Sequence, residues 1–319
     1  MGFFFKKVKT IFVILWILEV GFYSSALWAK SCDIYGEKID YSYFNEAIEL
    51  RYFKVLFNSS GMKLEEVEVV KYQHIAEQLQ AAEMVYNDIF NMKGLNNRER
   101  YENVNQVFVF IKDMEKYNGL VLSRSVGGVL GDGGCILRMN INKNISNRNL
   151  TPAHELFHFY HFSITSINRP WLREGLARWA MHIFSGNLSS GDVLPENMEQ
   201  MEVIFQESYR ASSFWVRLVS LLDRSSDIPI DSSNRFRKYK DGSAVVNGDV
   251  VIGGKFIRDL FFKLSERNRE LSEDLGKEWF RDKNNNHLQD EVIFEAIKEV
   301  VIKYNSGSQE LKNFLLISN

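Results

Sequence analysis

The segment RNLTPAHELFHFYHF, residues 148–162, is largely apolar, yet it carries three histidines and a glutamate. Thr151 is a good helix N-cap and Pro152 suits the first helical position, so we expect a helix that starts just before His154. Leucine and aromatic residues cover this helix on nearly every side, which is typical of a buried helix. Buried histidines and a buried carboxylate need partners, because leaving them unpaired costs free energy.

His154 and His158 are four residues apart, which places both imidazoles on one helix face with Cβ atoms about 5–6 Å apart. Two imidazoles at that spacing can bind one metal ion, and Glu155 can reach a metal-bound water as a general base. His161 lies about 10 Å along the helix from His154, too far to share an ion held by bonds of about 2.0–2.1 Å. We therefore expect His161 to be a packed residue or a neighbour of the ligands.

The third ligand is expected in PWLREGLARWA, residues 170–180, where Pro170 breaks the chain, Trp171 opens a second helix and Glu174 follows in its first turns. The alternative for Glu174 is a surface ion pair with Arg178, four residues on. The surrounding leucine and tryptophan residues favour burial of this helix instead. Two imidazoles and one carboxylate would leave one open position for water, as in catalytic zinc sites.

HELFH followed by WLREGLA resembles the gluzincins, zinc metallopeptidases that carry HExxH and a downstream glutamate. The resemblance covers about residues 105–185. It implies that His154, His158 and Glu174 bind one zinc ion and that Glu155 is the general base. The segments VFVFIKDM and GGVLGDGGCILRMNI look like the edge-strand region that precedes the zinc helix in such folds.

The sequence also departs from well-known gluzincins. Fifteen residues separate His158 from Glu174, fewer than in thermolysin-like enzymes or large aminopeptidases, and Arg178 stands where thermolysin-like enzymes have an aspartate. The absence of a GxMEN motif favours an endopeptidase over an aminopeptidase. In related enzymes a tyrosine or histidine stabilises the oxyanion. The candidates for that role are Tyr239, His182 and His287.

The pattern outside the motifs predicts an α+β protein. Residues 62–92 have the periodicity of one long helix, residues 103–114 alternate like a strand, and residues 119–141 indicate two or three short strands separated by glycines. Helices are expected after residue 150, apart from a loop near 224–253. Together with the resemblance, this implies a zincin-like fold with a small mixed or antiparallel sheet, an edge strand over the HExxH helix and a mostly helical C-terminal half.

We divide the chain into four predicted parts. Residues 1–29 are a signal peptide or N-terminal anchor, residues 30–102 an N-terminal helical segment, residues 103–223 the zincin catalytic core, and residues 224–319 a helical C-terminal part. The segment before residue 100 is expected to be either a pro-region or a scaffold helix.

The first 29 residues have the layout of a secretory signal. Three lysines precede a long apolar run, and small residues follow it. Glu19 within the run disfavours the alternative, an uncleaved membrane anchor. We expect an exported protein, periplasmic, extracellular or on the cell surface, with no membrane contact except through a retained N-terminal segment. In such a compartment Cys32 and Cys135 could form a disulfide or remain free thiols.

The charge balance and one further motif give no support for binding of nucleic acid or Ca²⁺. With 39 basic and 41 acidic residues the chain has no nucleic-acid footprint. The segment DKNNNHLQDE, residues 282–291, spaces Asp282 and Asp290 like calcium ligands, but His287 replaces the turn glycine and Ile293 the bidentate glutamate. A solvated turn is therefore a better interpretation than a Ca²⁺ site.

The sequence thus predicts an exported zinc-dependent peptidase that acts on a peptide or protein substrate with Glu155 as general base. The substrate is expected along an edge strand in residues 119–141. The alternative is a non-catalytic peptide- or protein-binding protein that keeps the fold and the metal.

Overall fold

The computed structural model describes most of the chain after residue 40. The described residues are 41–59, 66–127, 135–186, 191–277 and 279–318. The predicted export signal and Cys32 lie outside them. Cys135 takes part in a disulfide. Among the described helices, none has both the length and the apolarity needed to cross a membrane.

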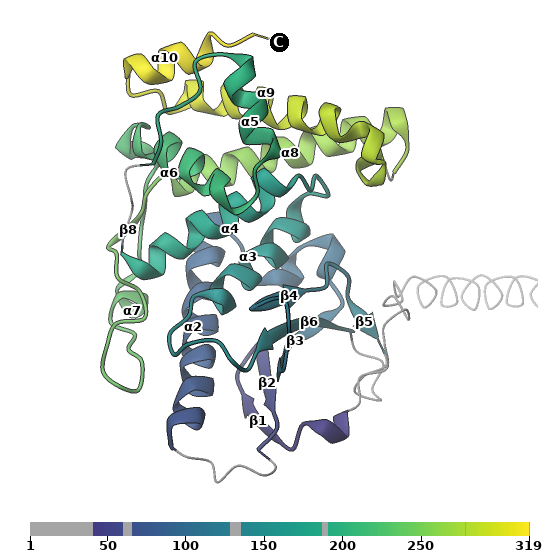
Figure 1. Cartoon of the computed structure of the whole chain (residues 1–319), viewed down its shortest axis with the longest axis vertical. Helices are drawn as coiled ribbons and strands as arrows, with labels where there is room; N and C mark the ends of the chain where they lie inside the picture. The colour runs from purple at the N-terminus through teal and green to yellow at the C-terminus, as the bar shows by residue number, and fades with distance from the viewer. Residues whose placement is uncertain (1–40, 60–65, 128–134, 187–190, 278, 319) are drawn as a thin grey trace, which may run out of the picture.

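A small mixed sheet forms one end of the molecule (Figure 1). Its strands run in the order β1-β2-β3-β6-β4, and β5 also pairs with β6. Strands β2, β3 and β6 are parallel, whereas β1, β4 and β5 pair antiparallel. The bounds are β1 Glu46–Glu49, β2 Phe53–Phe57, β3 Val104–Lys112, β4 Gly119–Val121, β5 Val126–Gly127 and β6 Cys135–Asn142.

Helices make up most of the chain after β6, which agrees with the predicted α+β class. In Figure 1, α3 and α4 lie between the sheet and the C-terminal helices, and α2 runs along their side. The helices are α2 Glu66–Phe90, α3 Thr151–Ile164, α4 Pro170–Ser185, α5 Met198–Gln206, α6 Ser212–Ser220, α7 Ser232–Arg235, α8 Gly254–Leu275, α9 Asn286–Lys303 and α10 Gln309–Leu315. The short strands β7 Ile228–Pro229 and β8 Val250–Val251 pair within the predicted loop.

The segment before residue 100 belongs to the scaffold of the fold. It contributes α2 as expected, but also two strands, β1 and β2, where only helix was predicted. Strand β2 pairs with β3, and α2 packs against α3 through stacked rings such as Phe90 and Tyr160, whose centroids are 5.7 Å apart. Removal of this segment would therefore expose both the sheet and α3.

Helix α3 starts one residue earlier than the capping pattern predicts. Leu150 occupies the N-cap position and offers no side-chain oxygen. Two other residues satisfy the free N–H groups of the first turn: Asn149 Oδ1 accepts from Thr151 N, and Gln78 Oε1 of α2 accepts from Ala153 N at 3.0 Å. The capping therefore comes partly from a distant helix, which fixes α3 on α2 immediately before the first histidine of the motif.

The segment between β7 and β8 packs against α2. Arg237 donates to Glu77 and Gln80 of α2, and Tyr239 accepts a hydrogen bond from Gln78. This segment is thus an ordered part of the wall around the start of α3.

Glu83 on α2 makes stability depend on pH. Burial raises its pKa to about 7, although the charge of Arg51 and a hydrogen bond from Asn87 act in the opposite direction. The folded state therefore holds this proton more tightly than the unfolded chain. The free energy of unfolding is expected to fall by about 2 kcal/mol as the pH rises from 4.5 to 7, relative to a Glu83→Gln variant. Urea denaturation of both proteins across this range measures the difference, and parallel pH profiles would contradict the prediction.

Candidate metal centre

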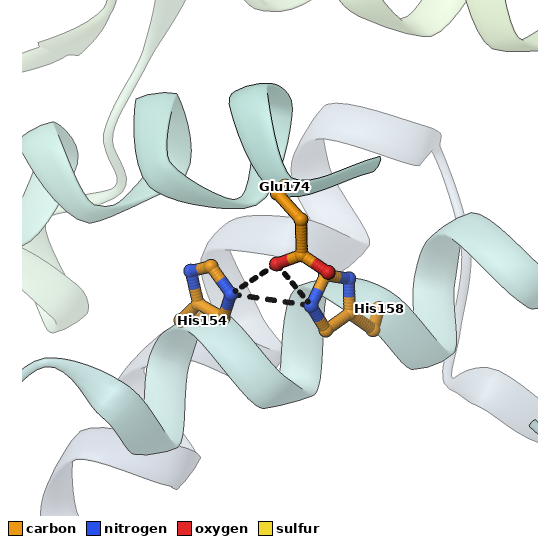
Figure 2. A group of neighbouring side chains, drawn as sticks. All are labelled: His154, His158 and Glu174. Carbon is orange, nitrogen blue, oxygen red and sulfur yellow. Dashed lines mark hydrogen bonds and ion pairs between the residues drawn. The ribbon is translucent and has the colours of Figure 1, made fainter. Parts of the chain in front are cut away.

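Three buried side chains from α3 and α4 converge on one point (Figure 2). His154 Nε2 lies 3.2 Å from His158 Nε2 and 3.1 Å from Glu174 Oε2, and His158 Nε2 lies 3.4 Å from the same oxygen. All three residues are less than a tenth exposed. The structure thus brings together the three ligands that the sequence predicts, in a group that could hold a metal ion.

The donor atoms His154 Nε2, His158 Nε2 and Glu174 Oε2 form a triangle, and the lengths of its sides match the donor spacing around a small cation. Ligand atoms bound tetrahedrally at about 2.0–2.1 Å lie about 3.3 Å from one another. The three measured separations, 3.1, 3.2 and 3.4 Å, fall on both sides of that value. Two imidazole nitrogens and one carboxylate oxygen are a donor set that divalent transition metals accept.

The start of α4 is anchored by the C-terminal half of the chain, and this anchor places Glu174. Asp290 Oδ1 of α9 accepts from Arg169 Nε and from Trp171 Nε1, both at 2.7 Å. Trp215 Nε1 of α6 donates to the Trp171 carbonyl at 2.9 Å. The Asp290 carboxylate, considered above as a calcium ligand, is therefore part of this buried contact.

Gly175 allows α6 to approach next to the ligand. A Cβ atom at this position would lie 2.7 Å from Trp215 Cδ1 and 3.1 Å from Ala211 Cβ. The glycine that follows Glu174 in the motif is thus explained by the close packing of the Trp215 indole against α4.

Arg173 fixes the orientation of the Glu174 carboxylate. Its Nε donates to Glu174 Oε1 at 2.7 Å, and its Nη1 donates to Asn168 Oδ1 at 2.8 Å. One carboxylate oxygen is thereby occupied, and the other, Oε2, faces the two histidines. Arg178, the ion-pair partner considered from the sequence, is instead exposed on the outer face of α4.

Electrostatics separate the roles of the two glutamates. Burial opposes ionisation of Glu174, but hydrogen bonds to His154 and His158 and the charge of Arg173 hold its pKa well below the usual range. Burial and the charge of Glu174 raise the pKa of Glu155 to about 8, while Arg173 lowers it. A cation at the triangle would lower the pKa of Glu155 again and favour its carboxylate form. Burial lowers the pKa of His158 to about 4, so this imidazole is neutral, as a metal ligand must be.

Glu155 lies beside the triangle and directly under β4. A Cβ atom on Gly119 would be 2.5 Å from Glu155 Cγ and 2.6 Å from its Oε1. Only a glycine at this position lets the strand lie so close to the carboxylate. Strand β4, which ends the described sheet order, thus lies against α3, and its contact point is Glu155.

Tyr209 is the neighbour of the site that the sequence does not indicate. It lies in a short 3-10 turn, Tyr209–Ala211, where its ring stacks on His154 with centroids 5.8 Å apart. Partial burial, the charges of Glu174 and Glu155, and a hydrogen bond with Glu174 raise its pKa to about 12. Its hydroxyl is thus protonated and half-exposed beside the ligands. No local pattern distinguishes this tyrosine from the others in the chain.

The other residues singled out from the sequence have their contacts elsewhere. Tyr239 packs on His74 with ring centroids 4.7 Å apart, and exposed His287 pairs with Glu291. His182 lies in the last turn of α4, about 12 Å along the helix from Glu174. His161 is completely buried, and its Nε2 donates to the Ile167 carbonyl in the turn between α3 and α4. His161 therefore stabilises the connection that brings α4 back over α3.

Comparison of the chain with protein-family profiles, curated proteins and solved structures finds no significant match.

Proposed function

We propose that this protein is an exported zinc-dependent endopeptidase. The observation that carries the proposal is a buried set of two histidines and one glutamate, spaced for one ion. A further buried carboxylate, Glu155, feels the charge of Glu174 and packs against Gly119 of β4. Zinc fits because catalytic zinc sites use three protein ligands of this kind and keep one position open. The lysine-led apolar segment at the N-terminus supports export.

A zinc ion held by His154, His158 and Glu174 would polarise the scissile carbonyl and lower the pKa of a water ligand to about 7. Glu155 accepts a proton from the attacking water and delivers it to the leaving amine. Arg173 keeps the Glu174 carboxylate turned toward the histidines. Tyr209, protonated and next to His154, donates a hydrogen bond to the oxyanion that forms on the substrate.

The outer edge of β4 supplies a place for an extended peptide. Asn142 N donates to Asn118 O, and Leu122 N donates to Arg138 O. In an antiparallel pair, residues that bond to the partner strand alternate with residues that do not. The backbone N–H and C=O groups of Gly119 and Val121 therefore point away from β6. Within the described part of the chain, no strand pairs with this edge. A substrate bound there by backbone hydrogen bonds would pass next to Glu155.

A peptide-binding protein without activity would need the strand edge but not Glu155. The close packing of β4 on the Glu155 side chain, made feasible by Gly119, favours the enzyme. Incubation of the purified protein with a diverse peptide pool, with and without 1,10-phenanthroline, tests the proposal. We expect internal cleavage that the chelator abolishes and added zinc restores. Binding without cleavage, or cleavage that the chelator leaves intact, would contradict it.

Gly119→Ala is expected to reduce peptide hydrolysis at least tenfold with little change in metal content. The added methyl group would overlap Glu155 Cγ and Thr151 Cγ2, both 2.5 Å from the ideal Cβ position, so the base or the strand must shift. Gly248→Ala is the matched control, because an added Cβ there would meet only Val250 O at 3.6 Å and Ile183 O at 3.9 Å, which are ordinary contacts. Initial rates and metal analysis of both variants measure the effect, and a fully active Gly119→Ala protein would refute the proposed contact.

Tyr209→Phe is expected to lower kcat about 10²-fold and to leave KM nearly unchanged. The substitution keeps the ring that stacks on His154 and removes only the hydroxyl donor. The same change at Tyr239, whose hydroxyl accepts a hydrogen bond from Gln78, is expected to affect stability rather than kcat. Steady-state kinetics separate these outcomes. If Tyr239→Phe lowers kcat and Tyr209→Phe does not, the role assigned to Tyr209 is wrong.

A further inference from the structure

A cavity of about 300 Å³ lies beside α2, and none of its lining residues belongs to the candidate metal site. Its walls come from three segments: the start of β2, one face of α2 with the residues just after it, and the segment between β7 and β8. Its volume is at the lower end of the range of small-molecule sites. The lining includes Arg51, Tyr52, Glu83, Asn87, Lys93 and Arg237.

The charge of this lining is positive. Arg51, Lys93 and Arg237 line the cavity, and Glu83 is the sole acidic residue among the described lining. Arg237 shares its charge with Glu77, at 3.0 Å. Within the described residues, neither Arg51 nor Lys93 forms a salt bridge with a carboxylate. Burial raises the pKa of Glu83 to about 7, which reduces the one negative charge of the lining at neutral pH.

A second groove in the molecule has a self-neutralised lining, in which both lysines form ion pairs with acidic residues of the same groove. This groove, about 630 Å³, lies between α8 and α9 and also contains three cations. There, Lys263 pairs with Glu266 at 2.9 Å and with Glu299 at 3.2 Å, and Lys303 pairs with Asp259. In this groove three acidic residues balance the three cations, whereas the lining of the smaller cavity has one acidic residue, Glu83, against Arg51, Lys93 and Arg237. Of these two cavities, the smaller one therefore has the excess of positive charge in its lining, although Arg237 is paired with Glu77.

The cationic groups of the smaller cavity are also partly held in place. Arg237 Nη1 donates to Gln80 Oε1, and the Arg51 guanidinium lies over the Tyr52 ring, 4.8 Å from its centroid. Asn87 is fixed by Tyr160, whose hydroxyl donates to Asn87 Oδ1 at 2.7 Å. Guanidinium groups held in this way bind planar carboxylates and phosphates with two parallel hydrogen bonds. Tyr52, Phe53 and Met84 add an apolar wall for the body of a ligand.

We propose that the cavity between α2, the start of β2 and Arg237 binds a small organic anion that carries carboxylate or phosphate groups. This site is separate from the metal centre and does not depend on the proposed peptidase activity.

Isothermal titration calorimetry with inorganic phosphate and with succinate tests the proposal and distinguishes the two sources of negative charge. We expect saturable binding of at least one probe, at one site per chain, with a Kd of about 1 mM or tighter. The double variant Arg51→Ala/Lys93→Ala is expected to weaken this binding at least tenfold. Both side chains are exposed at the rim, so the fold should tolerate the changes.

Two controls make the result decisive. Arg269→Ala removes an exposed cation from the larger, self-neutralised groove and should leave binding unchanged. His158→Ala alters the metal centre and should also leave it unchanged. Tighter binding of phosphate assigns the ligand to phosphorylated molecules, and tighter binding of succinate assigns it to carboxylates. Absence of saturable binding by both probes, or equal binding by wild type and the Arg51→Ala/Lys93→Ala variant, would overturn the proposal.

Discussion

Glu155→Gln is expected to lower the rate of peptide hydrolysis by about 10³-fold and to leave the metal content at the wild-type level. The amide has nearly the shape of the carboxylate but cannot accept a proton from the attacking water. Glu155 is not one of the three side chains whose donor atoms converge, so its replacement keeps the ligand set intact. Initial rates on a cleaved peptide, together with metal analysis of the same preparation, measure both quantities.

Glu299→Gln is the matched control, because this glutamate forms ion pairs with Lys263 and Arg267 on the surface of α8 and α9. It should retain full activity. A Glu155→Gln protein as active as wild type would show that another group takes the proton. Loss of both metal and activity would show instead that Glu155 is needed to hold the ion.

Glu174→Ala has the second large expected effect, a loss of zinc affinity of at least about 100-fold. The substitution removes one of three ligands and leaves two buried imidazoles without their carboxylate partner. Zinc should then no longer raise the Tm, whereas in wild type a ligand that binds only the folded state stabilises it. Competition with a chromophoric chelator and thermal unfolding with added zinc measure the two effects.

Arg178→Ala tests the alternative for Glu174 that the sequence left open. Arg178 lies four residues further along the same helix but on its exposed side, so this variant should bind zinc like wild type. If Arg178→Ala loses zinc and Glu174→Ala keeps it, the assignment of Glu174 as a ligand is wrong.

The convergence of His154, His158 and Glu174 was predictable because its geometry is mostly local. The spacing of His154 and His158 fixes their relative position on any α-helix. The apolar surroundings of Glu174 indicated that its helix is buried, and a short connection between two buried helices brings them side by side. The long helix α2 and the strands β3 and β6 were likewise visible as periodic patterns of apolar residues.

The residues that tune the site depend on distant contacts, which a sequence pattern does not contain. Tyr209 reaches His154 only because α6 and the turn before it pack on α4. Gln78 caps α3 from a helix more than seventy residues earlier in the chain. Strands β1 and β2 were missed because they are short and because β2 joins the sheet through β3, which follows it in the chain only after the whole of α2. Arg173 was overlooked because the helical pairing rule points to Arg178, whereas a side chain adjacent in sequence forms the ion pair.

We propose above all that His154, His158 and Glu174 bind one zinc ion. Metal analysis combined with zinc X-ray absorption spectroscopy of the purified protein tests it most directly. We expect one zinc per chain, coordinated by two imidazole nitrogens at about 2.0–2.1 Å and by oxygen ligands, and we expect this site to be lost in a His154→Ala/His158→Ala variant. A protein that binds no stoichiometric metal, or whose zinc has the same coordination in that variant, would contradict it.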